Sequence, residues 1–135
     1  MRTQPLVLLA DDNADFKEII SAKLVVAGYE IAEAKDGAEA IEMTKALKPD
    51  LVVMDIDMPN VNGTEAVLDI KNNPETAKIP IVFFSSLEHP WPGNVTDDKK
   101  TFAQELGAVT FLKKSEDLDK IVSTIKALVE NKPNP

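Results

Sequence analysis

Seven polar residues with chemically useful side chains come directly after apolar runs of the chain. They are three aspartates, two serines and two lysines: Asp11, Asp12, Asp55, Ser85, Ser86, Lys113 and Lys114. Three carboxylates in one crevice would repel one another unless a cation lies between them. Oxygen ligands without histidine or cysteine favour a hard ion, so Mg²⁺ is preferred over Zn²⁺. A lysine and a hydroxyl opposite such an ion would complete a site for phosphoryl transfer, with Asp55 as the nucleophile.

The strands that would carry these residues are visible as short apolar segments. Continuous apolar runs indicate strands buried on both faces of a parallel sheet, whereas alternation of polar and apolar residues indicates a strand nearer the edge. The continuous runs are residues 6–10 and 51–54, two further strands are expected at residues 79–84 and 109–112, and the alternating segment is residues 29–34. Right-handed crossovers place the carboxyl ends of such strands on one edge, where α/β proteins bind ligands. We therefore expect the polar residues to meet there, with Asp55 at the lip of a crevice.

Helices alternate with these strands, because apolar residues recur at helical spacing in the intervening segments. The helices are expected to begin near Ala14, Asp36, Thr64, Thr96 and Ser115, with Asp36 and Ser115 as caps and Gly28 closing the first. Their expected inner faces are Phe16, Ile19, Ile20 and Leu24; Ala40, Ile41, Thr44 and Leu47; Val67, Leu68 and Ile70; Phe102, Ala103 and Leu106; and Leu118, Ile121, Val122, Ile125, Leu128 and Val129. Five strands and five helices in alternation predict a three-layer α/β sandwich around a mostly parallel sheet.

The bulk properties of the chain exclude several classes of protein. A length of 135 residues suits one domain, residues 1–135, in which 131–135 form a frayed tail. A net charge of −8 and the lack of a basic stripe argue against direct binding to nucleic acid. The chain has no cysteine, which excludes disulfides and thiolate metal sites and fits a reducing compartment. No apolar run is long enough for a membrane span and no signal peptide is visible, so a cytoplasmic location is expected.

Five motifs in order resemble the receiver domain of two-component response regulators, and the resemblance covers essentially the whole chain. The motifs are LLADDN at 8–13, DGAEA at 36–40, DIDMP at 55–59 followed by Gly63, IPIVFFS at 79–85, and Gly107 and Ala108 leading to Lys114. The resemblance implies a flavodoxin-like fold with five parallel strands in the order 2-1-3-4-5. It also implies a signalling domain rather than an enzyme, one that catalyses only its own phosphorylation and dephosphorylation.

By this resemblance, Asp55 is the acceptor of a phosphoryl group from the phosphohistidine of a histidine kinase. Asp12 would bind Mg²⁺ directly and Asp11 partly through water, while Asp57 would contribute its backbone carbonyl. The reaction therefore requires Mg²⁺, with Asp55 as a further ligand.

The same resemblance assigns the residues that respond to phosphorylation. Ser85 matches the switch hydroxyl of the family, and Phe111 stands where an aromatic residue follows that hydroxyl. Lys114, seven residues after Gly107, matches the phosphate-binding lysine, which leaves Lys113 as the weaker candidate.

Three features depart from the pattern of the family. Ser115 replaces a proline that commonly follows the lysine, and a cis peptide at a non-proline bond costs about 3 kcal/mol. Ser86 stands where a small alanine-like residue is usual. The loop at residues 87–95 is longer than typical, and its Trp91, between two prolines, either packs back on the domain or is presented to a partner.

Other interpretations of the same residues stay open. Asp11 and Asp12 could simply cap a helix, and Asp55 could close a strand at a turn. A phosphatase of the haloacid dehalogenase type would use Asp55 as nucleophile and Asp57 as acid, but that family needs more chain after the motif. A pseudo-receiver would keep the fold as an interaction module without being phosphorylated.

The chain ends after the last expected helix, so output is expected through a downstream protein or onward phosphotransfer, with a histidine kinase or phosphotransfer protein as donor. The sequence does not identify the kinase or the pathway.

Overall fold

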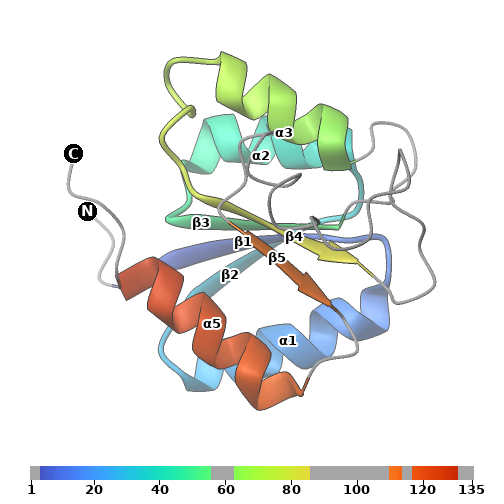
Figure 1. Ribbon diagram of the computed structural model, residues 1–135, viewed down its shortest axis with the longest axis vertical. Coiled ribbons are helices and arrows are strands. Elements are labelled where there is room, and N and C mark those ends of the chain that lie inside the picture. Colours follow the sequence, from blue (N-terminus) through green and yellow to red (C-terminus); the bar gives the residue numbers. More distant parts are fainter. Residues whose placement is uncertain (1–3, 56–62, 86–109, 114–116, 131–135) are drawn as a thin grey trace.

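A five-stranded parallel sheet forms the centre of the protein (Figure 1). The computed structural model describes residues 4–55, 63–85, 110–113 and 117–130. Its strands are β1 (Leu6–Ala10), β2 (Glu30–Ala34), β3 (Leu51–Asp55), β4 (Ile81–Ser85) and β5 (Thr110–Lys113). Their spatial order is β2-β1-β3-β4-β5, and all neighbouring pairs are parallel. The predicted fold class and strand order are confirmed.

Helices cover both faces of this sheet, which makes the three layers of the sandwich (Figure 1). The described helices are α1 (Ala14–Val26), α2 (Gly37–Leu47), α3 (Gly63–Asn72) and α5 (Leu118–Glu130). In the view of Figure 1, α2 and α3 lie above the sheet, and α1 and α5 lie below it. The helix expected after Thr96 lies outside the described residues, as does the tail at 131–135. No described helix is long and apolar enough to span a membrane.

Two hydrophobic cores fill the space between the layers, because successive residues of a strand point to opposite faces. Leu8 and Val52 belong to the core under α2 and α3, whereas Val7 and Val53 belong to the core under α1 and α5. All five residues of β1 and of β3 are buried, as expected for strands covered on both faces. Strand β2, by contrast, is more exposed and lies at an edge of the sheet.

Three apolar residues expected on inner faces are exposed instead. The predictions for Ile19, Leu47 and Leu68 are wrong, and Ile19 is 48% exposed. In α3 the buried stripe consists of Ala66, Val67 and Ile70, and Leu68 lies off that stripe. Leu47 is the last residue of α2, where the chain turns back through Lys48 in a left-handed conformation (φ 46°).

Helix α1 buries Lys17 together with Ile20 and Leu24, a spacing of three and four residues that forms one stripe. Apolar residues occur around most of this helix, so their spacing alone does not single out the buried face. Packing against the sheet selects the stripe that contains the lysine.

Side-chain caps fix the starts of the helices. Asn13 accepts from the Phe16 N–H at 3.0 Å in α1, and Asp36 accepts from the Glu39 N–H at 2.8 Å in α2. Gly28 follows α1 with φ 102°, a conformation that favours glycine, in agreement with the expected stop. Asp117 precedes α5.

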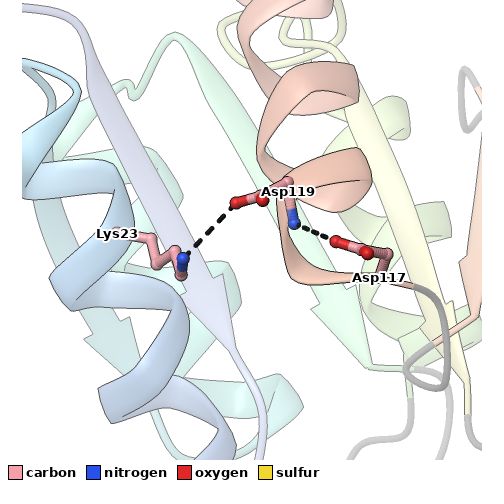
Figure 2. Close-up of polar contacts among 3 residues, drawn as sticks. All are labelled: Lys23, Asp117 and Asp119. Atoms are coloured by element: carbon pink, nitrogen blue, oxygen red, sulfur yellow. Dashed lines mark hydrogen bonds and ion pairs between the residues drawn. The ribbon is translucent and has the colours of Figure 1, made fainter.

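At α5 the expected cap was wrong: the helix begins at Leu118, and Asp117 accepts from the Asp119 N–H at 2.8 Å. Ser115, the predicted cap, lies outside the described residues. Figure 2 shows how the first turn of α5 meets α1: Lys23 forms an ion pair with Asp119 at 3.4 Å. Both side chains are exposed, so the pair adds little to stability.

Candidate metal site

Three carboxylates meet at the carboxyl edge of the sheet. Asp55 is the last residue of β3, and Asp11 and Asp12 directly follow β1. These two strands are neighbours, with Ala10 level with Met54, so the residues after them emerge side by side. One carboxylate oxygen of each of Asp11, Asp12 and Asp55 lies within 4.8 Å of the other two.

Hydrogen bonds of the β1–α1 turn hold Asp11 in its place. Its N–H donates to the Ala34 carbonyl of β2 at 3.1 Å. Its carboxylate oxygen Oδ1 accepts from the Asn13 N–H at 2.8 Å, and Asn13 in turn caps α1. The position of Asp11 is therefore coupled both to the end of the sheet and to the start of a helix.

The carboxylates differ in exposure, and this mixture suits a cation that reaches them from solvent. Asp11 is 3% and Asp55 5% exposed, whereas Asp12 is exposed. Buried carboxylates are costly unless opposite charge compensates them. Oxygens that share one Mg²⁺ lie at most about 4.2 Å apart, since each is about 2.1 Å from the ion. The three carboxylates thus have the donor chemistry of a magnesium site and need only a small adjustment of their spacing.

The expected phosphate-binding residues follow the neighbouring strands. Ser85 ends β4 directly after Phe84, which pairs with Asp55, and Ser85 itself pairs with Lys113 at the end of β5. Phe111 pairs with Phe83, further back in the sheet. These are backbone positions, and the side chains of Ser85, Phe111 and Lys113 lie outside the description. The other expected site and output residues, namely Asp57, Ser86, Trp91, Lys114 and Ser115, are outside the described residues altogether.

A family model for the response regulator receiver domain matches residues 7–126 of the chain. The chain belongs to this family. The domain is therefore a signalling module of the two-component type, in agreement with the strand order and with the acidic residues at its carboxyl edge.

Three proteins that are similar to this receiver domain differ in their length relative to it. It is 28% identical to the DNA-binding dual master transcriptional regulator RpaA of Synechocystis sp., over 93% of the chain and 49% of RpaA. It is 27% identical to Protein PilH of Pseudomonas aeruginosa, over 91% of the chain and 96% of PilH. The structure of chemotaxis protein CheY4 of Vibrio cholerae matches with a TM-score of 0.79 and 26% identity, over 93% of the chain and 98% of CheY4. The chain thus spans about half the length of RpaA but nearly all of PilH.

The sequence analysis missed Lys17, a buried cation next to the acidic residues of this receiver domain. Lys17 is 8% exposed, and its ammonium donates to the Ala34 carbonyl at 3.3 Å. The available signal was its spacing, because Lys17 precedes Ile20 and Leu24 by three and seven residues on one helical face. A lysine on a buried stripe next to an acidic site is a candidate functional residue.

Proposed function

We propose that this receiver domain accepts a phosphoryl group on Asp55 from the phosphohistidine of a histidine kinase or phosphotransfer protein, in a reaction that requires Mg²⁺. The observation that carries this proposal is the meeting of the Asp11, Asp12 and Asp55 carboxylates within 4.8 Å at the carboxyl edge of the sheet. A helix cap or a turn requires only one carboxylate. Neither role explains why three carboxylates from the ends of two strands, β1 and β3, meet at one place.

In the forward reaction a carboxylate oxygen of Asp55 attacks phosphorus. An O–P bond forms, the P–N bond to the histidine of the donor breaks, and the imidazole leaves with that electron pair and takes up a proton. Water later attacks the acyl phosphate, which restores the carboxylate and releases inorganic phosphate. Burial of Asp55 limits the access of water to the nucleophile before transfer.

Asp11, Asp12, Asp55 and the backbone carbonyl of Asp57 would hold Mg²⁺, which when bound offsets the negative charge of the phosphoryl oxygens. On the opposite side, the Lys114 ammonium would bind a phosphoryl oxygen and the Ser85 hydroxyl would donate to another. Phe111 would then turn inward as Ser85 moves. The backbone position of Ser85, one strand away from Asp55, supports this assignment.

The output of the domain would be a protein contact or onward phosphotransfer, in the cytoplasm and without direct binding to nucleic acid or membrane. The net charge of −8 disfavours contact with nucleic acid.

Incubation with acetyl phosphate and Mg²⁺, followed by intact-mass measurement, tests the proposal. We expect the mass of one added phosphoryl group in the wild type and none in the Asp55→Asn variant. Asp50→Asn is a matched control, because Asp50 lies before β3 and its carboxylate accepts from the Leu6 N–H, away from the acidic edge.

Other outcomes identify the rival functions. Addition of phosphate to the Asp55→Asn variant as readily as to the wild type would contradict the assignment. Turnover of a phosphate ester would indicate a phosphatase, and a wild type that never carries phosphate would indicate a pseudo-receiver.

A further inference from the structure

Lys17 is a buried ammonium, and buried ammonium groups need a compensating partner. Among the residues whose side chains the structure describes, it is the only buried lysine. Removing an ammonium from water costs several kcal/mol unless hydrogen bonds and opposite charge offset it. Its recorded hydrogen bond is to a neutral acceptor, the Ala34 carbonyl. A carboxylate near Lys17 would add the opposite charge that this hydrogen bond lacks.

The acidic site is linked to Lys17 through one backbone oxygen. The Ala34 carbonyl accepts two hydrogen bonds, one from the Lys17 ammonium at 3.3 Å and one from the Asp11 N–H at 3.1 Å. Lys17 and Asp11 are thus attached to the same oxygen atom at the end of β2. Both also line one cavity of about 10 Å³, which has room for about one water molecule.

The surroundings strengthen the interaction between these charges. The same cavity is lined by Phe16, Val53 and Phe84, and the aromatic rings of Phe16 and Phe84 meet edge to face with centroids 5.3 Å apart. Apolar walls lower the effective dielectric constant, so charges separated by more than a hydrogen bond still interact. Screening by salt is also weaker for buried than for exposed charges.

We propose that Lys17 is a positioning residue of the acidic site, whose ammonium acts as a permanent counter-charge for the buried carboxylates before metal binds. Anchored on the Ala34 carbonyl, it holds the turn that carries Asp11 and reduces the repulsion between Asp11 and Asp55. It touches neither the metal nor the phosphoryl group. The inference rests on the proposed function, because it concerns the same carboxylates and the same cation.

A positive charge on Lys17 repels Mg²⁺ and therefore weakens its binding. A role in packing alone would leave the affinity for Mg²⁺ unchanged, so the two roles can be distinguished by experiment. Loss of the ammonium should destabilise the metal-free protein and at the same time strengthen its affinity for Mg²⁺. A ligand stabilises the folded state more as its dissociation constant falls. The rise in Tm caused by Mg²⁺ should therefore be larger without Lys17 than with it.

The test compares wild type, Lys17→Met and Lys17→Arg by thermal unfolding with and without Mg²⁺ and by calorimetric Mg²⁺ titration. We expect Lys17→Met to have a lower Tm without metal, a larger rise in Tm with Mg²⁺, and Mg²⁺ binding tighter by roughly threefold to tenfold. Lys17→Arg, which keeps the charge, should have wild-type affinity. Lys17→Gln, which loses the charge but keeps an N–H donor, replaces the methionine variant if that protein does not fold.

Ile20→Val is the matched control, because it alters the same buried stripe without changing charge. It should lower Tm equally with and without Mg²⁺. The same pattern in Lys17→Met, or unchanged or weaker Mg²⁺ binding, would show that Lys17 only packs and would overturn the inference. A wild type that binds no Mg²⁺ would instead refute the proposed metal site itself.

Discussion

The carboxylates of Asp11 and Asp55 lie within 4.8 Å of each other at the ends of neighbouring parallel strands. Both are buried, and the exposed Asp12 completes the group. Three like charges at this distance destabilise the folded state and favour a divalent cation. Because Asp12 faces solvent, it can be changed without opening a cavity in the core, which makes it suited to a mutational test.

Asp12→Ala should have opposite effects on metal binding and on the stability of the metal-free protein. Removing a ligand should weaken Mg²⁺ binding by more than roughly tenfold. Removing one of three like charges should raise the free energy of unfolding without metal by roughly 1 kcal/mol. Mg²⁺ titration and urea unfolding measure the two effects. Asp15→Ala removes an acidic side chain from the first turn of α1 outside the group, and should leave Mg²⁺ affinity nearly unchanged.

Lys114→Ala should separate phosphorylation from its consequences. The variant should still gain phosphate from acetyl phosphate, because Asp55 and the proposed metal ligands are intact, but it should lose the conformational response. Lys113→Ala should behave like the wild type. Intact mass measures the first property and the change in amide chemical shifts on phosphorylation measures the second. Equal defects in the two variants would contradict the assignment of Lys114, made from its distance to Gly107, as the phosphate-binding lysine.

Tyr29 should make stability fall at alkaline pH. Burial raises the pKa of Tyr29 above its ordinary value of 10.0, and the negative charge of Glu130 adds to the rise. The unfolded chain therefore loses the phenol proton first, so the stabilisation is complete below pH 10.0 and is lost as the pH rises through the higher pKa of the folded protein.

Tyr29→Phe should remove this part of the pH dependence, measured by urea unfolding between about pH 9 and about pH 11. The chain has one tyrosine, so absorbance reports its ionisation directly. Glu130→Gln should bring the measured pKa of Tyr29 closer to the ordinary tyrosine value. A tyrosine that titrates at or below that value in the folded protein would contradict the assignment.

Trp91 should report whether the segment after β4 responds to occupancy of Asp55. It is the only tryptophan in the chain, so its fluorescence arises from one position. Mg²⁺ with beryllofluoride, a phosphoryl mimic, should shift its emission or its quenching by acrylamide, because the segment directly follows Ser85, the proposed switch residue. Unchanged emission and quenching, with Asp55 shown to be occupied, would mean that this position does not take part in output.

Site residues could be predicted from the sequence where they stand at the end of a strand. The apolar runs that end at Ala10 and Met54 locate β1 and β3, so Asp11 and Asp55 follow from the rule that parallel strands share a carboxyl edge. The helix start at Ala14 and the Asp36 cap are similarly local, although the sequence analysis did not identify Asn13 as the cap of α1. Strand β2 lies at the edge of the sheet, as expected from its mixture of charged and apolar residues.

The buried face of a helix was harder to predict from the sequence, as α1 shows. Ile19 and Lys17 lie on different faces, and hydropathy alone favours burial of the isoleucine. Local periodicity and the handedness of crossovers were enough to predict the fold class, the succession of elements and the edge where the acidic residues emerge. Burial of Lys17 and exposure of Ile19 follow instead from the way α1 packs on the sheet. The deciding contact joins Lys17 to Ala34, a residue of another strand, and the free energy of such a contact depends on packing that no local pattern contains.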